Sequence, residues 1–161
     1  MNFPRSPLPA FALLLSLGLL LSAMSHSGLS QQPLPAEGDE SQLLEVLNSD
    51  AELFDKAKAC QRLAVIGTSK SVPVVSRLLD DPQLSHYARF ALESNPSSEV
   101  DKAFREALGE LTGRPLVGVI NSVATRKDTE ATDALILAAG NEDAEVAAAA
   151  LSALGAIATA E

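Results

Sequence analysis

From residue 41 onward, apolar residues recur at helical spacing in four similar segments. Each segment holds an apolar-periodic stretch, a polar turn and a second such stretch. The second stretches end near Gly67, Asn95, Arg126 and Gly155, at spacings of 28, 31 and 29 residues. No stretch in this region alternates apolar and polar residues as a half-buried strand does. The pattern therefore predicts an all-α domain of about four two-helix repeats, stacked as an α-α superhelix.

In three of the predicted helices, the spacing of apolar residues indicates which side chains face the core. The predicted inward residues are Leu53, Ala57, Cys60, Ala64 and Gly67 in the stretch from Ala51; Leu84, Ala88, Ala91 and Leu92 in that from Leu84; and Val100, Ala103, Phe104, Ala107, Leu108 and Leu111 in that from Glu99. The predicted outward residues are Asp55, Lys58 and Arg62 in the first and His86, Arg89 and Glu93 in the second. Both sets follow from the 3.6-residue period of a helix.

Residues at the predicted helix ends suit their positions. Pro73 and Pro115 fall in first turns, where a missing N–H leaves no hydrogen bond unmade. Ser97 or Ser98 is expected to cap the helix that follows, and Asp143 the last helix, through side-chain oxygens that accept backbone N–H bonds.

The chain begins with a pattern typical of a secretory signal. Arg5 precedes a 15-residue apolar run from Ala10 to Met24, which small residues follow. We expect residues 1–27 to be a cleaved signal peptide and residues 28–40, which lack apolar periodicity, to be a flexible linker. The alternative is an uncleaved anchor, although the run is shorter than the roughly 20 residues that a span needs. The repeat domain would then cover residues 41–161, and the protein would be periplasmic or secreted.

Composition narrows the classes of partner and site. The 161 residues allow one domain, and 12 basic against 21 acidic residues give a net charge of -9. Removal of the leader would take away Arg5 and leave 11 basic residues. This acid excess argues against nucleic acid as a partner. A single Cys excludes an internal disulfide framework and any multi-cysteine metal site.

The second and fourth segments resemble HEAT-like repeats of the short, phycobilisome-lyase type. The matching residues are the acidic turn Asp80, Asp81 and Pro82 with Tyr87 and Ala88 to Leu92 in the second segment, and Asp143, Val146, Ala149, Ala150, Leu154, Gly155 and Ile157 in the fourth. Ala147 replaces the family's usual Arg, and the third segment lacks the acidic turn. The resemblance covers residues 41–158 and implies a solenoid, with little information on function. The chain also resembles the front part of longer exported bacterial proteins.

No residue is predicted to be catalytic, to bind a cofactor or to bind a metal. Cys60 is expected to be a buried, unreactive thiol; the alternative is a reactive or partner-linked one. His86, Arg89 and Glu93 are expected to form a solvated face, because no Ser or Cys is placed to use His86 as a base. Asn121 is expected to bond across to a neighbouring repeat.

Two other groups of residues are expected to be structural. The acidic clusters lack EF-hand spacing and are expected to act as helix caps and solubilising charge: they are Glu37, Asp39 and Glu40; Asp80 and Asp81; and Glu142 and Asp143. The glycines of the third segment do not form a phosphate loop, since no Gly-Lys-Ser/Thr motif follows them: they are Gly109, Gly113 and Gly118.

The leading hypothesis is a non-enzymatic scaffold that binds protein partners. The acidic balance favours a basic partner, or serves solubility alone. An accessory module of a larger exported enzyme, a chromophore-lyase-like activity and a structural spacer are the alternatives. The last stretch, from Ala144, is apolar around its circumference and is expected to expose Leu151. Either further repeats follow in a longer parent chain, or this helix meets a partner, including a second copy.

Overall fold

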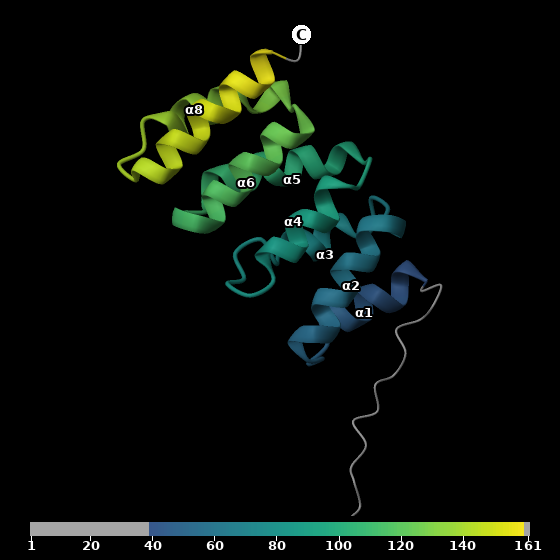
Figure 1. Ribbon diagram of the computed structural model, residues 1–161. Helices are drawn as coiled ribbons and strands as arrows, with labels where there is room; N and C mark the ends of the chain where they lie inside the picture. Colours follow the sequence, from purple (N-terminus) through teal and green to yellow (C-terminus); the bar gives the residue numbers. More distant parts are fainter. Residues whose placement is uncertain (1–38, 160–161) are drawn as a thin grey trace, which may run out of the picture. The chain divides into compact units, whose positions relative to one another are not determined.

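The computed structural model describes residues 39–159, and all regular secondary structure in that range is helical (Figure 1). The helices are α1 (Glu40–Asn48), α2 (Leu53–Ile66), α3 (Val72–Ser76), α4 (Ser85–Glu93), α5 (Ser98–Glu110), α6 (Gly113–Arg126), the 3-10 turn η1 (Thr129–Ala131), α7 (Thr132–Ala139) and α8 (Ala144–Ala158). The all-α prediction is confirmed for this range. The predicted signal peptide and most of the predicted linker lie outside the described residues.

Successive helices pair, and each pair packs against the next. Within pairs, α1 contacts α2, α3 contacts α4, α5 contacts α6 and α7 contacts α8. Between pairs, the odd-numbered helices contact one another in sequence order, and so do the even-numbered helices (Figure 1). Every pair of helices therefore corresponds to one of the four segments with a period near 30 residues.

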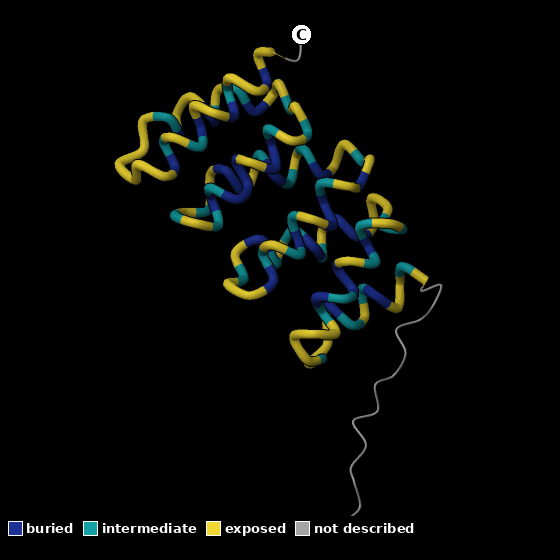
Figure 2. Tube along the Cα trace, viewed as in Figure 1, coloured by how far each residue is buried: buried dark blue, intermediate teal, exposed yellow. Residues whose placement is uncertain are grey.

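A continuous core runs between the two series of helices (Figure 2). The inward residues predicted for α4 are all buried, and Val100, Phe104, Ala107 and Leu108 of α5 are buried as well. On α8 the buried residues recur at three- and four-residue intervals: they are Val146, Ala150, Ala153 and Ile157. Helical periodicity thus identified the inward face of α4 correctly, and that of α5 except for Ala103 and Leu111, which are only half-buried.

The inward face predicted for α2 is partly wrong. Leu53, expected in the core, is 41% exposed, and Ala64 is only half-buried. Ala59 and Leu63, which the pattern did not place on the inward face, are buried together with Cys60. The reason is that α2 packs against both α1 and α4, so its buried stripe lies between these two neighbours. Periodicity within one helix does not show where a second neighbour will pack.

Side-chain caps fix several helix starts as the sequence predicts. The Ser97 hydroxyl accepts the Glu99 N–H at the start of α5, and Asp143 Oδ1 accepts the Glu145 N–H at 2.9 Å at the start of α8. Asp39 accepts the Ser41 N–H, so α1 begins at Glu40, the last residue assigned to the linker. Each cap satisfies an N–H that the helix leaves unpaired.

Candidate functional site

Polar side chains at the helix ends form hydrogen bonds between segments that lie far apart in sequence. The Glu40 carboxylate at the start of α1 accepts the Thr68 N–H at 2.7 Å and the Thr68 hydroxyl at 2.8 Å. Asn95, just after α4, is buried and donates through Nδ2 to the Thr68 carbonyl at 2.9 Å. Burial acts to raise the pKa of Glu40, but the hydrogen bonds from Thr68 and Ser71 outweigh it and the pKa is lowered.

Arg126, at the end of α6, contacts Asn95 and also joins α4 to α5. Its Nη1 donates to the carbonyl oxygens of Asn95 at 2.7 Å and of Glu93 at 3.1 Å, which lie at the end of α4. Its Nε and Nη2 form a two-point ion pair with Asp101 of α5. A guanidinium is therefore placed at the C-terminal end of α4, where unpaired carbonyls and the helix dipole favour a positive charge.

Arg89 and Glu93 do not form the solvated face that the sequence predicts. Both are half-buried between α4 and α6. Arg89 Nη1 donates to the Gly118 carbonyl at 3.3 Å, and the Ser122 hydroxyl donates to Glu93 Oε1 at 2.5 Å. A Cβ atom at position 118 would lie 2.6 Å from Arg89 Nε, so the close approach of the guanidinium needs a glycine there. The two residues are structural contacts of the next helix pair.

Asn121 also differs from its predicted role. Its side chain is exposed and forms no hydrogen bond within the described range, while its backbone carbonyl accepts one from the Thr125 hydroxyl. The amide that does bond across helix pairs is that of Asn95. The two residues occupy different places, because Asn121 lies on the outer side of α6 whereas Asn95 lies in the turn before α5.

Cys60 lies in the core, as the sequence predicts. Its exposed fraction is 0%, and burial raises the pKa of the thiol to about 11. The nucleophilic thiolate is therefore disfavoured at neutral pH, and a reagent has no access to the sulfur in the folded protein.

The other predicted candidates lie apart from one another. His86 is exposed, and its ring packs edge-on against Tyr87. Asp81 accepts the N–H groups of Gln83 and Leu84 in the turn before α4. Asp39 and Asp143 cap helices, as described above. Among residues 39–159, no group of three or more His, Cys, Asp or Glu side chains is placed to hold a metal ion.

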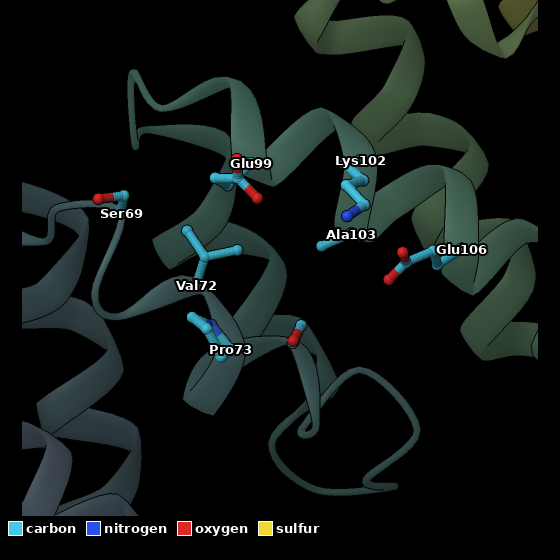
Figure 3. Close-up of a pocket in the computed structure, with 8 residues that line it drawn as sticks. Ser69, Val72, Pro73, Glu99, Lys102, Ala103 and Glu106 are labelled. Atoms are coloured by element: carbon cyan, nitrogen blue, oxygen red, sulfur yellow. The ribbon is translucent and has the colours of Figure 1, made fainter.

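An open groove of about 260 Å³ lies between α3 and α5 (Figure 3). Its lining residues are Ser69, Val72, Pro73, Ser76, Glu99, Lys102, Ala103 and Glu106. Its lining combines apolar atoms of α3 and of Ala103 with three charged side chains of α5. The arrangement suits binding of a polar or charged segment, and it brings together no nucleophile–base pair.

In the part of the chain that the structure describes, no helix has the length and apolarity needed to cross a membrane. The fold defines an all-helical protein of serially packed helix pairs. No protein-family model matches the sequence, and no curated protein matches it either.

Sequence reasoning missed the residues that tie the pairs together and those of the groove. The role of Arg126 was partly predictable, because a basic residue in the last turn of a predicted helix can pair with carbonyl groups. The shared face of the groove's charged residues was also predictable. The spacing of Glu99, Lys102 and Glu106 places them on one face of a helix, away from the apolar face. Neither feature indicates which neighbouring helix the side chains meet.

Proposed function

We propose that this chain is a non-enzymatic, exported protein-binding scaffold built of HEAT-like helical repeats. The observation that carries the proposal is the serial packing of four helix pairs, in which each pair contacts the next through both of its helices. A surface made in this way is continuous across the repeats, and such surfaces serve for binding other proteins.

The contacts between pairs support a repeated unit of about 30 residues. Hydrogen bonds between neighbouring pairs and the turns that join them connect residues 23 to 34 apart in sequence, and most of these separations lie between 27 and 31. Arg77, for example, donates to the Asn48 side chain 29 residues earlier. These separations agree with the spacings of 28, 31 and 29 between the segment ends.

Truncation tests the repeat architecture. A chain that ends after Lys127 lacks the fourth pair but keeps every contact among α1 to α6. In a repeat array, stability is close to a sum of terms from neighbouring units. We therefore expect this chain to stay helical and to unfold cooperatively at lower urea concentration, as measured by circular dichroism. Complete loss of helical structure at low protein concentration would instead indicate one indivisible globular core.

Site-specific photo-crosslinking tests the scaffold function and the compartment together. A benzophenone side chain is placed at Ser98 on the odd-numbered helices or at Phe90 on the even-numbered ones, both exposed. The variants are produced with the native leader in the source organism. We expect a discrete protein adduct from one face and not from the other, in exported material that lacks Met1. Absence of adducts from both faces, or an intact cytoplasmic chain, would contradict the proposal.

A further inference from the structure

The charged residues divide unevenly between the two series of helices. The odd-numbered helices carry seven acidic residues, Glu40, Glu45, Glu99, Asp101, Glu106, Glu110 and Asp133, against the basic Lys102 and Arg105. The even-numbered helices carry six basic residues, Lys56, Lys58, Arg62, Arg89, Arg114 and Arg126, against Asp55, Glu93 and Glu145. The excess negative charge of the helices thus belongs to the series that contains the groove.

The basic residues close to the groove are mostly engaged elsewhere. Arg77, just after α3, bonds to Asn48 at 2.8 Å, so its charge is directed toward α1. Lys70 lies close enough to Asp39 and Glu40 to help lower the pKa of both carboxyls. Arg105 pairs with Asp128 and Glu130. Of the basic side chains on the odd-numbered helices, this leaves Lys102 facing the groove.

Glu99 and Glu106 mark the two ends of the groove along α5, with Lys102 between them (Figure 3). Seven residues of helix separate the two carboxylates by about 10 Å along its axis. Alternate residues of an extended chain point to the same side and lie about 7 Å apart, so two long basic side chains on that side can reach both carboxylates. Val72, Pro73 and Ala103 supply an apolar surface between the carboxylates, against which the methylene stem of a Lys or Arg can pack.

We propose that the groove between α3 and α5 binds an extended, Lys- or Arg-rich segment of a partner protein. This inference rests on the proposed scaffold function and names the chemistry of its partner. Glu99 and Glu106 would pair with basic side chains of the segment, and its backbone would lie along α5. Ser69 and Ser76 supply hydroxyl groups for its polar backbone. The negative charge of the odd-numbered helices steers such a segment to the groove and repels nucleic acid and anionic lipid.

Lys102 gives the proposal a second, opposite test. Its ammonium group forms no ion pair within the described residues, although Glu99 and Glu106 lie three and four positions away on the same helix. It therefore acts as a positive charge that the bound segment must tolerate. Removal of the Glu99 and Glu106 charges should weaken binding, whereas removal of the Lys102 charge should strengthen it.

The experiment measures binding of a fluorescein-labelled peptide of alternating Arg and Ala to the exported chain, by anisotropy at two salt concentrations. The double variant Glu99→Gln/Glu106→Gln should weaken binding about fivefold, since exposed ion pairs contribute modestly. Lys102→Gln should tighten it about twofold. The control Glu45→Gln/Glu110→Gln has the same charge change on the same series of helices outside the groove, and should stay within about twofold. Circular dichroism verifies that all variants keep the wild-type fold.

Three results would overturn the proposal. They are equal weakening by the groove and control variants, equal binding of a Glu–Ala peptide, and no binding of the Arg–Ala peptide at millimolar concentration. The scaffold function is judged separately by the crosslinking result. An adduct that forms with undiminished yield in the Glu99→Gln/Glu106→Gln variant would keep the scaffold and exclude the groove. Absence of any adduct would contradict the scaffold itself.

Discussion

Replacement of Arg126 by Met should destabilise the fold through the junction of three helices. The Arg126 side chain is 13% exposed, and its guanidinium group bonds both to Asp101 and to the carbonyls at the end of α4. Met keeps most of the apolar stem but removes the charge, so it leaves Asp101 unpaired and the carbonyl groups without a donor. The variant thus tests the polar contacts rather than packing.

The magnitude follows from how far the ion pair is buried. Breaking a fully buried pair costs about 3–5 kcal/mol, whereas an exposed pair contributes about 0–1 kcal/mol. Asp101 is 26% exposed and Arg126 is less so, which places this pair between the two limits. The positive charge at the end of α4 adds about 0.3–1 kcal/mol. We therefore expect Arg126→Met to lower the free energy of unfolding by about 2–3 kcal/mol.

Urea unfolding followed by circular dichroism at constant ionic strength measures this loss. Arg114→Met is the matched control, because Arg114 is an exposed residue of the same helix and forms no ion pair within residues 39–159. It should change stability by less than about 0.5 kcal/mol. Arg126→Lys should recover part of the loss, since it keeps the charge without the two-point geometry.

A double-mutant cycle with Asp101→Asn separates the ion pair from the carbonyl contacts. We expect a coupling free energy of about 1 kcal/mol or more between positions 101 and 126. The reasoning would be refuted if Arg126→Met cost no more than Arg114→Met. Zero coupling together with a large loss would assign the stabilisation to the carbonyl groups alone.

Four further predictions concern separate parts of the chain. A thiol reagent should label Cys60 slowly under native conditions and rapidly in denaturant; fast native labelling would contradict its burial. Leu151, which is 62% exposed, should promote self-association, so Leu151→Glu should lower the sedimentation coefficient at high concentration if α8 mediates it. Because the pKa of Glu40 is lower in the folded state, its stabilising effect is present above its ordinary pKa of 4.5 and is lost as pH falls through the folded value. Urea titrations should therefore show Glu40→Gln less stable than wild type near pH 7, with the difference shrinking as the pH falls below 4.5. Mass spectrometry of exported protein should find residues 1–27 removed, and an intact Met1 in a membrane fraction would favour an anchor instead.

Local residue patterns were enough to predict the helical class and the division into helix pairs. Each predicted stretch contains a helix, and the inward residues of α4 and α8 follow their 3.6-residue period. Caps such as Ser97 and Asp143 were also identifiable, because a cap bonds to a backbone group only two or three residues away. These features depend on local geometry alone, which the order of residues fixes.

Which polar side chains are buried, and where the groove lies, depends on how the helices pack together. Arg89 and Glu93 have the spacing of an exposed surface pair, yet the approach of α6 at Gly118 covers them. Leu53 has the spacing of a core residue, yet it remains exposed. The 3.6-residue period of a helix shows which side chains share a face, but their burial depends on the position of the neighbouring helices. That position results from packing between residues nearly 30 apart in sequence, for which the pattern of a single helix contains no information.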